Sequence, residues 1–288
     1  MIKVRKLVIP VAGMGTRFLP VTKSLPKEML PIVDVPTIQV LLEEASNAGI
    51  EEVIFVTNDK KESIVKHFDK DIELEEKLEK ANKVDLLEKL RKINPGLKIS
   101  SVKQTEALGS GHAIYQAKDL VNGEPFAVMY GDDLIKGGCA LKELIEVYEK
   151  NDANVIGVQT VPHELTYKYG IVSLEDDETL KINGLVEKPK VEEAPSDLAG
   201  LGRYIVKPEI FNILETLSTG AGGEYQFTDA MKLLMKEQDF YACKFTGTYY
   251  DIGSQLGYLK ANIMYGLDRE DVKESLLKFM KEIVEKED

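Results

Sequence analysis

Residues 7–31 read LVIPVAGMGTRFLPVTKSLPKEMLP, and this stretch decides how the rest of the chain folds. It begins with a short apolar run, passes directly into a turn that contains Gly13 and Gly15, and then carries Arg17 and Lys27. Glycines without Cβ atoms let backbone N–H groups approach phosphate oxygens closely, and the two cations can neutralise charge that amides alone leave. A tight turn with solvated basic residues is the alternative for a short Gly-x-Gly motif. The cations at fixed offsets favour a polyphosphate site.

Two familiar phosphate-binding motifs are absent from this stretch. It contains no G-x-x-x-x-G-K-[ST] sequence, so the turn is not a P-loop. A dinucleotide fingerprint would have a third glycine at position 18, where Phe18 stands. Asp34 lies about where the ribose-binding acid of that fingerprint would fall, but Pro31 and Pro36 bracket it, so no strand end presents it. The pattern is therefore weak support for a dehydrogenase.

The composition indicates a small anionic ligand rather than a polyanionic partner. The chain has 288 residues, 43% of them hydrophobic, enough for one large core or a core with a small appended lobe. A net charge of −12 would be repelled by nucleic acids and by membrane surfaces. Cys139 and Cys243 provide neither a disulfide framework nor metal-ligand spacing, and the N-terminal apolar run is too short for a signal peptide or membrane span. We expect a soluble cytoplasmic protein that binds neither nucleic acid nor membrane.

Alternating helix and strand patterns predict a parallel sheet. Residues 38–45 carry apolar side chains at helical spacing, Gly49 follows at a C-cap position, and residues 52–57 (EVIFVT) form a buried strand. Strand–helix–strand order implies an α/β fold with a mostly parallel central sheet flanked by helices. Further strands are expected at 97–104, 126–130 and 154–160. Shorter strands and turns from Tyr167 onward predict a small mixed-β region.

Two charged segments are expected at the surface. Residues 60–93 carry leucines at helical spacing among many charges, which predicts a solvated helix or helix pair ending at residues 94–96 (NPG). Residues 268–286 form a charged helix with one apolar stripe. Ordinary surface packing is one interpretation of both segments and a subunit contact is the other. From these segments we expect a homo-oligomer.

Three segments beyond the first carry groups that could bind ligands. Residues 104–113 (QTEALGSGHA) form a second glycine-rich turn from strand to helix, at the sheet edge where ligands of α/β proteins bind. Asp132 and Asp133 follow a buried strand and a glycine, a position suited to Mg²⁺ that carries substrate phosphates. Glu187 and Lys188 are adjacent in a strand that ends at a proline. Solvated acids in a turn and a solvated charge pair are the structural alternatives for the last two.

The first stretch and the residues after it resemble a known superfamily. Residues 13–20 (GMGTRFLP) and 26–31 (PKEMLP) are similar to the signature of the sugar-nucleotide pyrophosphorylases. Residues 27–34 (KEMLPIVD), followed by residues 39–45 (QVLLEEA), resemble specifically the bacterial UTP–glucose-1-phosphate uridylyltransferases. Further matches continue to about Leu259, so the resemblance covers nearly the whole chain.

The resemblance implies a nucleotidyltransferase that uses Mg²⁺. UTP and α-D-glucose 1-phosphate would give UDP-glucose and pyrophosphate by in-line attack of the sugar phosphate on the α-phosphorus. It implies catalytic roles for Arg17, Lys27 and Lys188, and metal binding by Asp132 and Asp251. Where Tyr249 stands, the family commonly has a basic residue, so this chain lacks a cation beside Asp251.

The same resemblance divides the binding residues between two regions. It implies that Gln104 reads the uracil ring, with Glu28 behind the turn. Nucleotide binding falls to Ala12, Gly13, Gly15, Thr16, Glu28, Gln104 and Gly109, and sugar-phosphate binding to Gly170, Glu187, Lys188 and Gly202. The fold implied is that of nucleotide-diphospho-sugar transferases, which is Rossmann-like. We expect one domain over residues 1–288, with a nucleotide-binding part at 1–160, a sugar-phosphate-binding part at 161–266 and a C-terminal helix at 267–288.

Two alternatives to uridylyl transfer remain. One is a pyrophosphorylase for a different nucleotide or sugar phosphate. The Lys-Glu-Met-Leu-Pro sequence and the Gln104–Gly109 loop favour uridine over other nucleotides. The other is a catalytically idle relative that binds a sugar nucleotide and regulates a partner. The presence of both Asp132 and Asp251 argues against the idle relative, because binding alone does not require two metal-facing acids.

Overall fold

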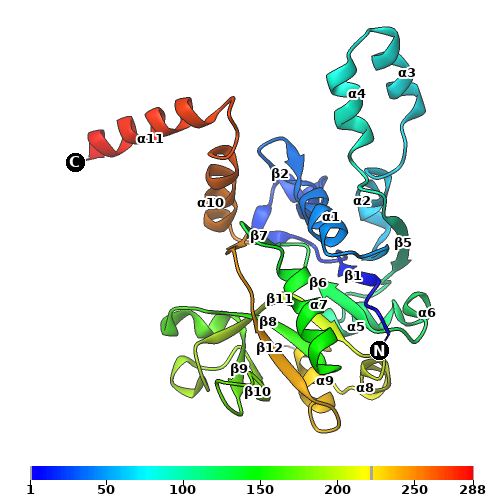
Figure 1. Cartoon of the computed structure of the whole chain (residues 1–288), viewed down its shortest axis with the longest axis vertical. Helices are drawn as coiled ribbons and strands as arrows, with labels where there is room; N and C mark the ends of the chain where they lie inside the picture. Colours follow the sequence, from blue (N-terminus) through cyan, green and yellow to red (C-terminus); the bar gives the residue numbers. More distant parts are fainter. Residues whose placement is uncertain (1, 221–222, 288) are drawn as a thin grey trace.

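Four parallel strands form the centre of the main sheet. The computed structural model describes residues 2–220 and 223–287 (Figure 1). β1 (Lys6–Pro10) pairs in parallel with β4 (Glu52–Thr57) on one side and β6 (Phe126–Met129) on the other, and β5 (Lys98–Lys103) extends the sheet beyond β4. Three of these strands are almost wholly buried, as their near-continuous apolar sequences predict for parallel strands covered on both faces. The expected parallel centre is confirmed.

One antiparallel strand joins this centre to the mixed-β region. The C-terminal half of β11 (Leu198–Val206) pairs with β6, and its N-terminal half pairs with β9 (Gly170–Leu174), which pairs in turn with β10 (Ile182–Glu187). β8 (Asn154–Thr160) runs along the other edge of β11 and is followed by β12 (Phe240–Lys244). The sheet is therefore continuous across residue 160, and the division into parts at 160 and 266 stays a prediction.

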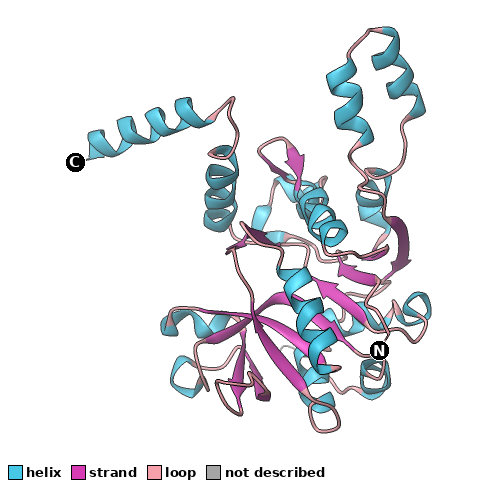
Figure 2. Cartoon of the chain, in the orientation of Figure 1, coloured by secondary structure: helices cyan, strands magenta, loops and turns pink. Residues whose placement is uncertain are grey.

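Helices cover both faces of the sheet (Figure 2). Successive side chains of β1 point to opposite faces, so they pack against different groups of helices. Leu7 and Ile9 pack in one apolar cluster with α1 (Thr37–Asn47) and α7 (Ala140–Asn151). Val8 points to the opposite cluster. The helices of that second cluster are α5 (Ser110–Tyr115), α8 (Ile210–Thr216) and α9 (Phe227–Leu234).

Two helical segments extend away from the sheet (Figure 1). α3 (Ile72–Lys80) and α4 (Val84–Arg91) form a hairpin above α2 (Glu62–Lys66), which confirms the expected surface helix pair. α10 (Gln255–Gly266) leads to α11 (Lys273–Glu287), which ends far from the body of the molecule. Among the described residues, no helix combines the length and apolar character that crossing a membrane requires.

Short elements connect these layers. They comprise six 3-10 helices (η), four short strands and one α-helical turn among the described residues: η1 (Thr16–Phe18), η2 (Val21–Lys23), η3 (Lys27–Met29), β2 (Pro31–Ile32), β3 (Val35–Pro36), η4 (Asp59–Lys61), α6 (Lys118–Val121), β7 (Asp133–Lys136), η5 (His163–Lys168), η6 (Val191–Glu193) and β13 (Thr248–Asp251). β7 and β13 pair with each other in a separate antiparallel ribbon.

A buried ion pair ties the junction strand to its surroundings. The Arg203 side chain on β11 is fully buried, and its guanidinium donates to Glu44 Oε2 of α1 at 2.7 Å and to the backbone carbonyl of Asp133 at 2.9 Å. Glu44 Oε1 also accepts a hydrogen bond from the backbone N–H of Leu141 at 3.1 Å. One carboxylate therefore connects α1, α7 and β11.

We predict that Glu44→Ala lowers the free energy of unfolding by about 3–5 kcal/mol, because the substitution leaves the Arg203 charge buried without its partner. Glu43→Ala changes an exposed neighbour on the same helix and should alter stability by less than about 0.5 kcal/mol. Urea unfolding of both variants measures the difference. Equal stabilities for the two variants would show that the buried pair does not support the junction.

Candidate active site

Two cavities flank the turn that follows β1. A larger cavity of about 590 Å³ is lined by Arg17 of η1 and by residues that follow β6 or belong to β9, β10, β11, α9 and β13. A smaller cavity of about 250 Å³ is lined by Ala12 and Met14, by residues 58–60 and by Gln104 and its neighbours. The predicted nucleotide residues and the predicted sugar-phosphate residues therefore lie on the two sides of one turn.

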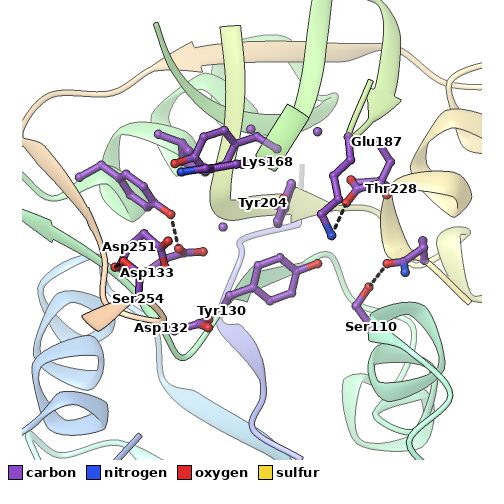
Figure 3. Close-up of a pocket in the computed structure, with 18 of the residues that line it drawn as sticks. Ser110, Tyr130, Asp132, Asp133, Lys168, Glu187, Tyr204, Thr228, Asp251 and Ser254 are labelled. Carbon is purple, nitrogen blue, oxygen red and sulfur yellow. Dashed lines mark hydrogen bonds and ion pairs between the residues drawn. The ribbon is translucent and has the colours of Figure 1, made fainter. Parts of the chain in front are cut away.

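Acidic side chains gather at one end of the larger cavity (Figure 3). Asp132 follows β6, and Asp251 ends β13 directly opposite Asp133 in the β7–β13 ribbon. Gly253 marks the point on which these groups converge. A Cβ atom there would lie 2.8 Å from Asp132 Oδ2, 3.0 Å from Asp251 Oδ1 and 3.3 Å from Arg17 Nη1. The predicted metal ligands and one predicted catalytic cation are thus brought together.

These two carboxylates fit Mg²⁺ that arrives with phosphates. Mg²⁺ in nucleotide sites is commonly held by one or two carboxylates together with water and substrate phosphate oxygens. Within the described part of the chain, no three His, Cys, Asp or Glu side chains form a metal site by themselves.

Lys27 lies against Asp132, the first of the two predicted metal ligands. Its Nζ atom is 2.5 Å from Asp132 Oδ2. Burial acts to lower the pKa of Lys27, but the carboxylates of Asp132 and Glu28 outweigh burial and raise that pKa. Burial likewise acts to raise the pKa of Asp132, and the Lys27 ammonium outweighs it, so the pKa of Asp132 lies below its usual value. Both groups are charged at neutral pH and neutralise each other.

Asp133 has a different environment from its neighbour. Its Oδ1 atom accepts a hydrogen bond from the Tyr249 hydroxyl at 2.6 Å. Burial, reinforced by the nearby Asp132 carboxylate, raises the pKa of Asp133 to about 7. Gly202 has φ +62° and packs on this carboxyl so closely that a Cβ atom would lie 1.9 Å from Asp133 Oδ2. A glycine is therefore required at position 202, both by its positive φ and by its close packing on the Asp133 carboxyl. Tyr249, which stands where relatives commonly have a basic residue, contacts Asp133 through a hydrogen bond instead of a charge.

The opposite end of the larger cavity is suited to hydroxyl groups. Glu187 and Thr228 meet there beside Gly170, where a Cβ atom would lie 3.2 Å from Glu187 Oε2 and 3.4 Å from Thr228 Cγ2. Lys188 lies 3.4 Å from Glu187 and has φ +44°, a strained conformation for a non-glycine residue that is typical of functional sites. Within the described residues, Thr228 Oγ1 is the buried side-chain polar atom without a hydrogen-bond partner. The Thr228 side chain lines the cavity, and Cγ2 is the atom of it that lies beside Gly170.

The smaller cavity contains the loop that was predicted to read a base. Gln104 Nε2 lies 3.3 Å from the Gly109 carbonyl and 3.0 Å from His112 Nδ1, so neighbouring groups fix the amide. Gly109 has φ +109°, and a Cβ atom there would lie 2.7 Å from the Tyr225 carbonyl. The Tyr225 backbone N–H donates to Leu108 at 2.8 Å, and its carbonyl accepts from the Gly111 N–H at 2.7 Å. The base loop is thus fastened to the segment that enters α9.

The remaining predicted residues lie between the two cavities or beneath them. Gly13, Gly15 and Thr16 form the turn that separates Ala12 from Arg17, and Gly15 has φ +66°. Glu28 is fully buried and contacts Lys61 instead of lining either cavity.

Sequence reasoning missed Tyr130, whose side chain lines the larger cavity, and Lys61, which lies beneath the turn. Neither residue belongs to a local motif that marks it. Tyr130 lies between the two ends of the larger cavity (Figure 3).

Comparison with known proteins agrees with this arrangement. The Nucleotidyl transferase family profile matches residues 6–266. The chain is 47% identical over 284 residues to a UTP–glucose-1-phosphate uridylyltransferase of Staphylococcus epidermidis, covering 98% of this chain and 99% of that protein. It is 45% identical to the Bacillus subtilis protein of the same name over 99% of both chains. A UTP-bound UGPase from Acinetobacter baumannii is 41% identical with a TM-score of 0.89, covering 98% and 99% of the two chains. A UDP-glucose pyrophosphorylase complexed with UDP-glucose has a TM-score of 0.84 at 41% identity, covering 93% and 100%.

The raised pKa of Asp133 predicts a specific pH dependence of stability without metal. The folded protein holds a proton that the unfolded chain releases near pH 3.8, so this residue lowers the free energy of unfolding as pH rises from about 4 to 7. The groups that act on it are Asp132 and Asp251, which raise its pKa, and Tyr249 and Arg203, which lower it.

Asp133→Asn removes this titration. Between pH 5 and pH 7, the variant should therefore gain stability relative to the parent by up to about 1.4 kcal/mol per pH unit. Urea unfolding with EDTA at the two pH values measures the change. A stability difference that is independent of pH would show that Asp133 is already ionised at pH 5.

Proposed function

The chain belongs to the nucleotidyl transferase family, and we propose that its two cavities hold the two substrates of one reaction. The reaction makes UDP-glucose and pyrophosphate from UTP and glucose 1-phosphate, the activity for which the relatives are named. In our proposal the uracil ring enters the smaller cavity, the triphosphate crosses the turn that contains Gly13 and Gly15, and glucose 1-phosphate occupies the larger cavity. The positions of Arg17 and Lys27 beside that turn support this arrangement.

The proposed transfer is a single in-line displacement. An oxygen of the sugar phosphate attacks the α-phosphorus of UTP, the new P–O bond forms as the bond to the β-phosphate oxygen breaks, and pyrophosphate leaves with the electron pair. A phosphate whose second pKa is near 6 is already anionic at neutral pH, so no general base is needed. Positioning and neutralisation of charge supply the catalysis. Arg17 and Lys27 would hold the triphosphate, and Lys188 would hold the attacking phosphate.

The acidic end of the larger cavity is proposed to bind the cofactor. Asp132 and Asp251 would hold Mg²⁺, which when bound supplies positive charge for the substrate phosphates. For Asp132 to do so, Lys27 must release its carboxylate. The triphosphate offers the Lys27 ammonium an alternative anion. When UTP and Mg²⁺ bind, Lys27 would exchange Asp132 for the triphosphate, and Asp132 would exchange Lys27 for Mg²⁺.

The opposite end of the larger cavity is proposed to bind the sugar. The single observation that carries this assignment is the Glu187 carboxylate in the cavity wall, with its Oε2 atom beside Gly170. A glucose hydroxyl can donate a hydrogen bond to that carboxylate. Gly170 leaves the space for the ring.

We also propose that the protein works in the cytoplasm as a homo-oligomer. Cys139 and Cys243 are both free thiols, which is typical of a reducing compartment. α11 carries Phe279, Ile283 and Val284 with exposures of 58%, 45% and 61%, and it leads away from the body of the molecule. An amphipathic helix with such side chains is stabilised when a second copy covers them.

We predict that the parent protein, given glucose 1-phosphate, Mg²⁺ and each nucleoside triphosphate in turn, releases pyrophosphate with UTP in preference to the others. Asp132→Asn keeps the side-chain volume but removes a charge, so it should lose at least about 10²-fold in turnover at any Mg²⁺ concentration. The variant leaves Lys27 without this partner and should unfold at a lower urea concentration than the parent, but the folded protein should still bind UDP-glucose in calorimetry with EDTA present.

Asp177→Asn, at an exposed position in the turn before β10, is the matched control and should retain full turnover. Full Mg²⁺-dependent activity of Asp132→Asn would refute the metal assignment. A parent that binds UDP-glucose but releases no pyrophosphate with any nucleotide would support the idle relative instead.

We predict that the parent sediments as an oligomer and that Phe279→Glu/Ile283→Glu shifts it toward monomer, because charges replace apolar contacts between copies. Lys278→Glu alters the charge of the same helix by a similar amount at an exposed polar position and should leave the sedimentation coefficient unchanged. Sedimentation velocity at several protein concentrations decides between the outcomes. A parent that is monomeric throughout would remove α11 as an interface.

A further inference from the structure

A buried lysine lies beneath the phosphate turn and has no place in the reaction described above. Lys61 ends η4, and only 6% of its surface is exposed, although Asp59 and Lys60 before it are solvated. Its Nζ atom lies 2.8 Å and 3.1 Å from the two carboxylate oxygens of Glu28, which is 0% exposed. Both charges of this pair are therefore removed from water, an arrangement that is expensive unless each partner is satisfied by the other.

This pair lies directly beside the pair that Lys27 makes with Asp132. Glu28 follows Lys27 in η3, so adjacent residues supply one member to each ion pair. Glu28 also packs under the loop that bears Asp132, since a Cβ atom at Gly131 would lie 3.0 Å from Glu28 Cγ. Two lysines and two carboxylates thus lie in one region, in which Lys61 and Glu28 are buried while Lys27 and Asp132 are partly exposed.

The pairing in this region has a second possible arrangement. The Glu28 carboxylate acts on both lysines, since it favours the charged form of Lys27 as well as that of Lys61. Burial raises the pKa of Glu28, while Lys61 and Lys27, in that order, oppose the rise. Lys27 is therefore the next cation available to Glu28 after Lys61. Without Lys61, the buried Glu28 carboxylate would lack its partner, and the ammonium of the adjacent residue Lys27 would be the cation that still acts on it.

We propose that Lys61 is a positioning residue that occupies both oxygens of Glu28 and so keeps Lys27 directed toward Asp132 and the substrate phosphates. The inference rests on the proposed function for the role of Lys27. Lys61 itself touches no substrate, because neither cavity is lined by it. Its contribution to turnover passes entirely through Lys27.

The first test compares Lys61→Met with the double variant Lys61→Met/Glu28→Gln. Lys61→Met should lower kcat by about 10- to 100-fold and weaken UTP binding with EDTA present by about tenfold, because Glu28 then attracts Lys27. The double variant removes the competing carboxylate as well, so its kcat and UTP affinity should each exceed those of Lys61→Met by about tenfold. Lys66→Met removes an exposed lysine of α2 that pairs only with Glu62, and it should resemble the parent in every measurement.

The second test asks whether the effect passes through Lys27. In a Lys27→Met background, adding Lys61→Met should leave kcat unchanged, since there is no ammonium left to divert. If the ion pair has only a structural role, Lys61→Met should lower the melting temperature without changing kcat of the folded protein. The decrease in melting temperature should then add to that caused by Lys27→Met.

The outcomes separate this inference from the proposed function. Parent-like kcat in folded Lys61→Met, an additive loss in the Lys27→Met background, or a double variant that folds without recovering UTP affinity would each overturn the role of Lys61. If Lys61→Met fails to fold, the double variant decides alone. Recovery of UTP affinity on removal of the Glu28 charge would show that the unpaired Glu28 carboxylate caused the defect. A parent that releases no pyrophosphate would refute the proposed function, and the calorimetric UTP affinities would still decide the role of Lys61.

Discussion

The burial of charge around the loop after β6 is the constraint on which the rest of the structure depends. This loop carries Asp132 and Asp133 into a region where an uncompensated charge costs several kcal/mol. Lys27 neutralises Asp132, whereas Asp133 is accommodated by a hydrogen bond from Tyr249 and by a raised pKa. Each of these partners comes from a different segment of the chain. The folded arrangement of those segments is therefore selected by the electrostatic requirements of two adjacent side chains.

The junction strand β11 turns this local requirement into a site for two substrates. It pairs with β6 over one half and with β9 over the other, so the loop that follows the parallel centre faces the strands of the mixed-β region. The irregular register between Gly200 and Tyr204 gives Gly202 the conformation that lets it pack on Asp133. Arg203, one residue later, holds the same loop by its backbone. In the proposed arrangement, the nucleotide and the sugar phosphate therefore meet over one continuous sheet.

Much of this fold was predictable from local patterns, and the limits are equally physical. The strands at 52–57 and 154–160 agree with the structure to the residue, because apolar β-formers there are bounded by polar residues. That Asp132 and Gln104 line cavities was predictable, because each follows a strand of the parallel centre and ligands of such sheets bind at the carboxyl ends of the strands. Their individual roles came from the family resemblance and stay predictions. Lys61 was not predictable, since its charged neighbours suggested a solvated helix and its burial depends on Glu28 from another part of the sequence. The contact of Tyr249 with Asp133 depends on the register of β13 against β7, which no sequence pattern displays.

The backbone hydrogen bonds of Tyr225 connect the loop at the smaller cavity to the wall of the larger cavity. This connection affects how the specificity of such proteins can change. The Tyr225 backbone is fastened to Leu108 and Gly111 in the base loop, and the chain then passes within three residues to Thr228 at the sugar end. Reshaping the loop for a larger or differently substituted base would pull on the wall that contacts the sugar. We therefore expect evolution, and protein engineers, to find that the choice of nucleotide and the choice of sugar change together, through paired substitutions rather than independent ones.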